Sequence, residues 1–218
     1  IAQRRTGHLS DRIDREEVDP HRTPVDLAQA SDDRFARHAR DVEAAVRQAV
    51  GEQLPTLRCS VEAAVTQLGA LTDIVAQRAR FADLVVLPKP YGNGQGTEAE
   101  AVVEAALFEG HAPVLVLPGA EAPALPGRIV IGWNQSREAM VAVRRALPLL
   151  KRAQMVNITV IDPPQHGPER SDPGGMLCQM LVRHGVRAEV TVLARTLPRV
   201  SDVLLRHLRD MSAEMLVM

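Results

Sequence analysis

Residues 128–162 decide the fold, and they read RIVIGWNQSREAMVAVRRALPLLKRAQMVNITVID. The apolar run 128–132 predicts a buried strand, residues 136 to about 151 have helical spacing, and 156–161 predicts a second buried strand. Strand, helix and strand in such short alternation indicate parallel crossovers, which need helices on both faces of the sheet. The stretch therefore predicts an α/β protein with an open parallel sheet.

The alternation continues toward the C-terminus. We expect a helix over 176–184 that stops at Gly185, a strand over 187–193, a helix over 201–209 and a strand over 215–218. The connecting loop 162–175 holds four prolines and is too long for a simple connector, so it is either mobile or part of a site.

The first half of the chain shows a similar pattern. A helix over 31–50 would carry Phe35, Ala39, Val42, Val46 and Ala49 on one face and stop at Gly51. After it we expect a strand over 56–65, a helix over 72–80, a strand over 84–87, a glycine-rich loop over 92–96, a helix over 98–109 and a strand over 114–117. Residues 1–26 are polar without an apolar period, and 119–127 is a proline-rich linker. The predicted organisation is a poorly ordered or divergent segment (1–26), a first domain (27–118), the linker and a second domain (128–218).

The two halves repeat each other. The stretches that begin at Arg58 and Arg187 match at Val61 and Val190, at Leu68 and Leu197, at Thr72 and Ser201, and at Asp73 and Asp202. The hydroxyl and carboxylate pair is typical of a helix N-cap, so capping is the favoured interpretation. The strand at 128–132 maps to a position before Ile1, and residues 88–117 have no counterpart after Met218, so we expect both copies to be incomplete.

Composition excludes several classes of function. The 26 Lys and Arg residues balance 27 Asp and Glu, which gives no electrostatic pull toward nucleic acid or membrane. No apolar run approaches the roughly 20 residues of a membrane helix. Cys59 and Cys178 are far apart in the sequence and fit ordinary buried thiols in a reducing compartment. The seven histidines have no metal-ligand spacing and no G-x-S-x-G motif is present, so we predict neither a metal site nor catalytic residues.

Ligands of doubly wound sheets bind at the carboxyl ends of the strands, where the winding reverses. The turn after 128–132 contains Trp133, Asn134, Gln135 and Ser136. Ser136 is placed to cap the following helix. Asn134 can offer its amide to a ligand or form the turn itself, and Trp133 suits packing better than recognition.

A second candidate is the glycine loop with Gly92, Gly94 and Gly96, which leads into a helix as phosphate-binding loops do. It lacks the spacing of both common phosphate-binding motifs. Thr97 and Glu100 have the spacing of a capping box, which would use the free N–H groups internally. Glu98, Glu100 and Glu104 would also repel an anion, so this is a degenerate phosphate loop.

The stretch 128–162 resembles the opening of a universal stress protein domain. Residues 82–118, ADLVVLPKPYGNGQGTEAEAVVEAALFEGHAPVLVLP, are similar to the ending of such a domain. The resemblance covers about 31–218 and implies a tandem of two flavodoxin-like (adenine nucleotide α-hydrolase-like) open parallel sheets. In the ATP-binding branch of that family an Asp stands where this chain has Asn134, and a Gly where it has Gln135; Ser136 alone matches. In the first copy Pro88 replaces a loop glycine and Glu100-Ala101 replaces a Gly-Ser or Gly-Thr pair, so that copy is not expected to bind ATP.

The resemblance implies a non-enzymatic stress-response protein in the cytoplasm. A bound nucleotide, ATP or AMP, would lie near Trp133, Asn134, Gln135, Ser136, Asp162 and Met218, and the corresponding glycine loop would follow Met218. The fifth strand, 114–117, would form a homodimer or an intramolecular pseudo-dimer, with neither nucleic acid nor membrane as a partner. Two alternatives stay open: a ligand-free interaction module, and an ATP-hydrolysing relative of the same fold.

Overall fold

The computed structural model describes residues 24–62, 66, 68–92, 96–119, 125–163 and 171–218. Most of the predicted 1–26 segment, part of the linker, Gly94 and residues 63–65 lie outside these ranges. The chain folds as two compact units, unit 1 over Ile1–Ala120 and unit 2 over Glu121–Met218. Each unit is described by itself.

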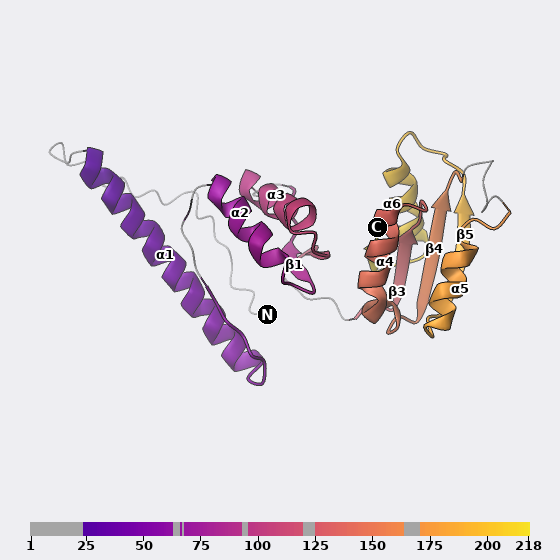
Figure 1. Ribbon diagram of the computed structural model, residues 1–218, viewed down its shortest axis with the longest axis horizontal. Helices are drawn as coiled ribbons and strands as arrows, with labels where there is room; N and C mark the ends of the chain where they lie inside the picture. The colour runs from indigo at the N-terminus through magenta and orange to yellow at the C-terminus, as the bar shows by residue number, and fades with distance from the viewer. Residues whose placement is uncertain (1–23, 63–65, 67, 93–95, 120–124, 164–170) are drawn as a thin grey trace. The chain divides into compact units, whose positions relative to one another are not determined.

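Unit 2 is a parallel sheet wound by three helices (Figure 1). Its elements are β3 (Arg128–Gly132), α4 (Arg137–Leu150), β4 (Met155–Ile161), α5 (Gly175–Arg183), β5 (Ala188–Leu193), α6 (Val200–Asp210) and β6 (Met215–Val217). The strand order is β5-β4-β3-β6, and every pairing is parallel. The predicted α/β class with open parallel sheets is therefore confirmed, and each predicted element of this half ends within one residue of its observed bounds.

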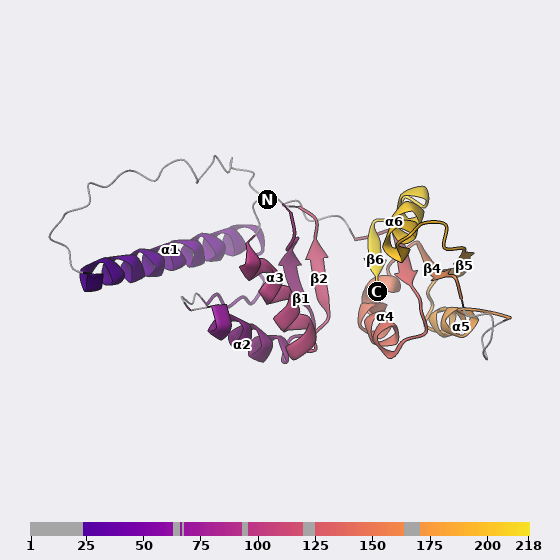
Figure 2. The same ribbon diagram turned by 90° about the horizontal axis from the view of Figure 1, so that it is seen from above.

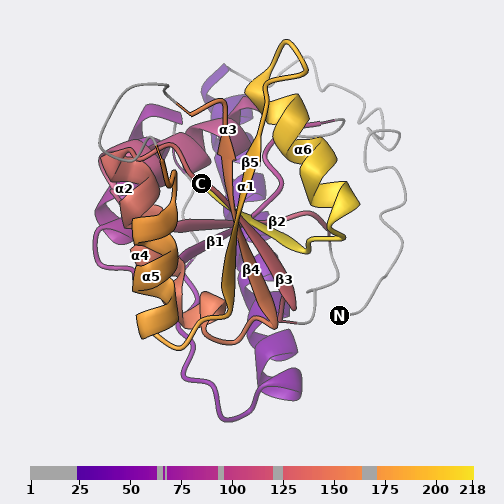
Figure 3. The same cartoon turned by 90° about the vertical axis from the view of Figure 1, so that its right-hand side faces the viewer.

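Unit 2 has three layers. Figure 2 shows α6 on one side of the strands and α4 with α5 on the other, and Figure 3 shows the same separation from the end. The α4 and α5 side holds the main core, in which Ile129, Ile131, Val156, Ile158 and Leu181 are at most 1% exposed. The members of this core cluster alternate along β3 and β4 because successive strand residues point to opposite faces of the sheet.

The winding reverses between β3 and β6. From β3 the chain moves outward to β4 and β5, with α4 and α5 on one face, and then returns across the other face through α6 to β6 on the far side of β3. This reversal is the position where open α/β sheets bind ligands at the carboxyl ends of the strands.

Unit 1 contains a smaller parallel sheet. Its elements are α1 (Pro24–Gln53), α2 (Leu68–Ala79), β1 (Val85–Pro88), α3 (Thr97–Glu104), the π-helix η1 (Ala105–Glu109) and β2 (Val114–Leu117). The strands β1 and β2 pair in parallel, and Val85 and Val114 pack against a small alanine core. A Cβ on Gly110 would lie 2.5 Å from the Cβ of Ala79, so the absence of a side chain lets η1 approach α2 closely.

Two predictions for unit 1 were wrong. The helix α1 continues through Gly51, and Val42 and Val46 on its predicted apolar face are exposed. The strand expected over 56–65 does not form in its described part, 56–62. Its counterpart in unit 2 is β5, which is held by β4. The described part of unit 1 offers no such neighbour, and a strand without one has no partner for its backbone hydrogen bonds.

The predicted caps were also wrong at three helix starts. Thr72 lies inside α2, where its Oγ1 donates to the Gly69 carbonyl oxygen at 2.7 Å. Ser201 lies in the first turn of α6, and Arg199 holds the N-cap position without a capping bond from its side chain. The predicted capping box fails because Thr97 is the first helical residue of α3 and Gly96 is the N-cap. Each helix begins at least one residue earlier than the cap pattern requires.

The two cysteines differ in their surroundings. Cys59 is exposed, so the expectation of two buried thiols is wrong for this residue. Cys178 is partly buried, and desolvation, with a smaller contribution from the negative charge of Asp172, raises the pKa of its thiol. The Cys178 thiol is therefore a poor nucleophile at neutral pH.

None of the helices in the described ranges is both long and apolar enough to cross a membrane.

Candidate functional site

The carboxyl edge of unit 2 brings the predicted ligand residues together. The segment from Trp133 to Ser136 follows β3, Asp162 follows β4 and Met218 follows β6, and these three strands are neighbours. Because parallel strands point the same way, the three ends meet at one edge. A Cβ on Gly132 would lie 3.8 Å from the Cβ of Met218, which places the β3 turn beside the end of β6. We call Trp133, Asn134, Gln135, Ser136, Asp162 and Met218 the carboxyl-edge site.

Asn134 and Ser136 build the turn between β3 and α4. The Asn134 Oδ1 accepts a hydrogen bond from the backbone N–H of Ser136 at 3.0 Å, which is the turn-forming role considered for this residue. The Ser136 Oγ accepts from the backbone N–H of Ala139 at 3.0 Å and caps α4. Asn134 and Gln135 between these anchors are exposed.

Replacing Ser136 with alanine removes this cap. We expect Ser136→Ala to lower the free energy of unfolding by about 1 kcal/mol, because one backbone N–H of α4 loses its acceptor. Urea denaturation measures the change. Ser201→Ala is the matched control, since Ser201 lies one residue inside α6 and is not its N-cap, and it should change stability by less than about 0.5 kcal/mol. Equal losses for the two variants would contradict the capping role of Ser136.

Two residues of the carboxyl-edge site have left-handed backbone conformations. Gln135 has φ of 65° and Asp162 has φ of 49°. His111 and Ser212 also have positive φ, but each lies just past the C-cap of a helix, where that conformation is common. Gln135 and Asp162 follow strands instead. Non-glycine residues in this region cost of order 1 kcal/mol or more each and gather at ligand sites.

Trp133 lies beneath this edge. Its side chain is 7% exposed and belongs to the main core cluster, so packing is its role in this structure. Its backbone N–H donates to the Thr159 carbonyl oxygen at 2.9 Å, which ties the turn to β4. Among the described residues its indole Nε1–H has no hydrogen-bond partner.

A polar network centred on the buried residues Asn157 and Thr159, on the opposite face of the sheet, was missed from the sequence. It joins β4, β5 and α6 through Asn157, Thr159, Glu189, Thr191 and His207. The Asn157 amide donates to Glu189 at 3.0 Å and to Thr191 at 2.8 Å. Its Oδ1 accepts from the Thr159 hydroxyl at 2.8 Å and lies 3.0 Å from the His207 Nε2.

This network is fully satisfied at Asn157. The amide uses both N–H groups and both acceptor positions, which is the full capacity of the side chain. The Oδ1 can only accept, so His207 donates from Nε2. Thr159 belongs both to this network and, through its carbonyl oxygen, to the Trp133 turn. Through Thr159 the network therefore supports the turn at Trp133, which belongs to the carboxyl-edge site. Its sequence signal is Asn157 and Thr159 at alternating positions of an otherwise apolar strand.

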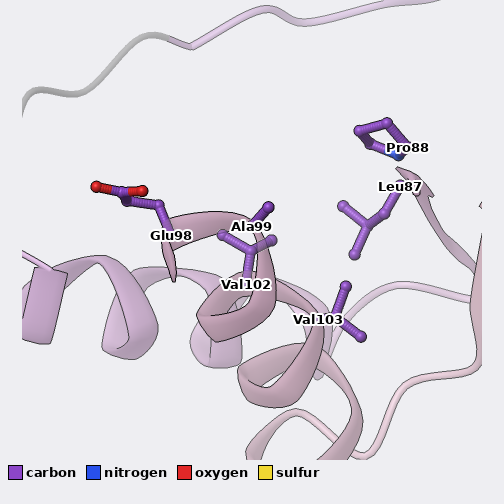
Figure 4. Close-up of a pocket in the computed structure, with 6 residues that line it drawn as sticks. All are labelled: Leu87, Pro88, Glu98, Ala99, Val102 and Val103. Atoms are coloured by element: carbon purple, nitrogen blue, oxygen red, sulfur yellow. The ribbon is translucent and has the colours of Figure 1, made fainter. Parts of the chain in front are cut away.

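The start of α3 in unit 1, where the sequence suggests a degenerate phosphate loop, is lined by apolar side chains and one carboxylate. Between β1 and α3 lies a hollow of about 220 Å³. Figure 4 shows the residues that line it, Leu87, Pro88, Glu98, Ala99, Val102 and Val103. The Glu98 side chain points away from Leu87, and its carboxylate lies against Gly96 at the N-terminus of α3. A carboxylate there occupies the position where an anion would benefit from the helix dipole. Apolar walls and a negative charge oppose phosphate binding in unit 1.

Within the described ranges, no group of three or more His, Cys, Asp and Glu side chains is arranged to hold a metal ion.

Comparisons with known proteins found matches only among solved structures. No family model and no curated protein matches the sequence. A universal stress protein from Archaeoglobus fulgidus DSM 4304 aligns with 94% of this chain and 70% of its own length, with a TM-score of 0.56 and 11% identity. Protein Rv1636 from Mycobacterium tuberculosis H37Rv aligns with 44% of this chain and 72% of its own length, with a TM-score of 0.34 and 17% identity. A universal stress protein family member from Burkholderia pseudomallei aligns with 45% of this chain and 82% of its own length, with a TM-score of 0.34 and 19% identity.

The Archaeoglobus protein carries the structural argument, because its alignment spans nearly the whole chain. At 11% identity the likeness concerns the fold. The architecture that the sequence resemblance implied is thereby confirmed, and the chain has the open, parallel α/β fold of a universal stress protein.

Proposed function

We propose that this chain is a universal stress protein that binds an adenine nucleotide at the carboxyl-edge site of unit 2 and acts in the stress response without catalysing a reaction. The fold supports the family, and the reversal of winding between β3 and β6 supports the position of the ligand. We place the protein in the cytoplasm, in keeping with its free cysteines.

The observation that carries the proposal is the backbone conformation of Gln135 and Asp162. Both residues leave neighbouring strands in left-handed conformations that no helix end explains. These conformations direct the chain away from the sheet at two adjacent points, beside the exposed Asn134. Amide groups and a carboxylate at such an edge suit the hydroxyls of a ribose and the polar edge of a base.

The charge of the site argues against strong phosphate recognition by these residues. The six side chains of the carboxyl-edge site include one carboxylate, Asp162, and no positive charge. We therefore expect the base and ribose to supply most of the binding energy. AMP and ATP should bind with dissociation constants within about threefold of each other, a difference of less than about 1 kcal/mol.

Calorimetric titration of AMP and ATP into the full 218-residue chain tests the proposal. Asp162→Ala should weaken binding about tenfold, because a hydrogen bond to a charged group is lost. Glu98→Gln in unit 1 is the control and should leave binding unchanged. The absence of heat at millimolar nucleotide would contradict the proposal. Release of pyrophosphate or phosphate from ATP would contradict its non-enzymatic part and favour the hydrolase alternative.

The fifth-strand position in unit 1 supports a proposal about assembly. Among the described strands β2 pairs with β1 alone, so one edge of β2 has no partner strand there. We propose that Val114–Leu117 pairs with a second copy of the chain or within a pseudo-dimer. Sedimentation equilibrium should give the mass of a dimer if the strand pairs with a second copy, and the mass of a monomer if it pairs within a pseudo-dimer.

A ligand-free interaction module is the second candidate function. It is favoured by the apolar lining and the Glu98 carboxylate of the hollow in unit 1.

A further inference from the structure

The indole of Trp133 combines deep burial with an unused donor. The side chain is 7% exposed and belongs to the same core cluster as Ala139 of α4 and Leu177 of α5. Its Nε1–H finds no acceptor among the residues that the structure describes. A donor that has lost water without gaining an acceptor raises the free energy of the folded state. Native proteins keep few such groups, and each one needs an explanation.

The backbone around this donor is anchored on both sides. The Trp133 N–H is bonded to the Thr159 carbonyl oxygen at 2.9 Å, and the Ser136 hydroxyl is bonded to the first turn of α4 at 3.0 Å. Between these anchors stand Asn134 and Gln135, which are exposed. Gln135 has φ of 65°, so the turn already holds strain. A shift of these two residues would break the bond from the Ser136 N–H to the Asn134 Oδ1 and leave the two anchoring bonds in place.

We propose that the Trp133 indole N–H donates a hydrogen bond to the ligand of the carboxyl-edge site once Asn134 and Gln135 shift. This inference rests on the proposed function. The acceptor would be uncharged, a ring nitrogen or carbonyl oxygen of a nucleotide base, because the ring lies in an apolar cluster where a buried charge is unfavourable. Trp133 is thus a specificity-determining residue that selects ligands with such an acceptor.

Trp133→Phe in the full chain tests the inference, with AMP as the probe. The variant keeps an aromatic ring and loses the N–H group. We expect the dissociation constant for AMP to rise about fivefold to tenfold, the usual effect of one lost hydrogen bond. The thermal midpoint should change little, because loss of the buried donor offsets the smaller ring volume.

A spectroscopic readout adds a measurement that a purely structural role would not move. The sequence has one tryptophan, so a ¹⁵N-labelled chain gives one indole N–H resonance. Addition of AMP should move this resonance downfield, as expected when the N–H gains an acceptor.

Ile131→Val is the matched control, since Ile131 lies in the preceding strand and the same core cluster and carries no donor. It should lower the thermal midpoint and leave the AMP affinity unchanged. Wild-type affinity in Trp133→Phe, or an unmoved indole resonance, would overturn this inference alone. An absence of AMP binding by the wild-type chain would overturn the proposed function and this inference together.

Discussion

Asn157→Asp is expected to lower the free energy of unfolding by about 3–5 kcal/mol at pH 7, the range found when a buried charge is left uncompensated. Asn157 is 1% exposed, and its amide donates to the Glu189 carboxylate at 3.0 Å and to the Thr191 hydroxyl. The substitution removes both donors. It also places a second carboxylate within hydrogen-bonding distance of Glu189, and the new charge itself lies where its side chain is almost fully shielded from water.

The loss should depend on pH in a definite direction. Burial and the neighbouring Glu189 would raise the folded-state pKa of the new carboxyl group above its unfolded value of about 3.9. Such a group destabilises the fold increasingly as pH rises above the unfolded pKa. The difference from wild type should therefore shrink as the pH falls from 7 toward 4. Urea denaturation across this range measures it.

Asn134→Asp is the matched control for this prediction. It makes the same chemical change at an exposed turn, where the Oδ1 that accepts from Ser136 is retained. Its effect on stability should stay below about 0.5 kcal/mol. If both variants lost the same stability, Asn157 would not hold the network that the structure shows.

Gly174→Val is expected to lower the free energy of unfolding by about 2–5 kcal/mol. Gly174 has φ of 89°, and an added Cβ would lie 3.4 Å from methyl groups of Ile158, Val160 and Val190. The left-handed conformation costs a branched residue about 1–2 kcal/mol, and the additional methyl groups in a packed core cost about 1–3 kcal/mol. Thermal or urea unfolding checks the sum.

Gly185→Val separates the two contributions. Gly185 has φ of 80°, but apart from its two chain neighbours none of the described residues lies within 4 Å of an added Cβ. This variant should therefore show the backbone term alone, about 1–2 kcal/mol. A Gly185→Val loss as large as that of Gly174→Val would mean that packing over β4 and β5 contributes nothing.

The sequence predicted unit 2 well because each strand there pairs with a neighbouring strand and the helices pack against the sheet. The apolar runs of β3 and β4 form neighbouring strands, and Ser136 and Gly185 mark the ends of helices as expected. In unit 1 the strand predicted over 56–65 is absent from its described part, 56–62, because a strand forms only where a neighbour accepts its hydrogen bonds. The caps at Thr72, Thr97 and Ser201 failed for a local reason: helix starts depend on packing as well as on the cap residue.

The candidate site was predictable in position but not in detail. The reversal of winding placed Trp133, Asn134 and Ser136 at the edge from sequence alone. The left-handed conformations of Gln135 and Asp162 depend on how the turns meet the packed strands. The burial of the Trp133 indole and the bond between Asn157 and His207 arise from tertiary contacts, the latter across 50 residues of sequence, which no local pattern encodes.

The central claim is that an adenine nucleotide binds at the carboxyl-edge site of unit 2. Amide chemical-shift mapping of the ¹⁵N-labelled chain during titration with ATP tests it most directly. The account predicts saturable shifts at Trp133, Asn134, Gln135, Ser136, Asp162 and Met218, with the amides of Gly92 and Gly96 in unit 1 unchanged. Shifts confined to unit 1, or no shifts at millimolar ATP, would contradict it.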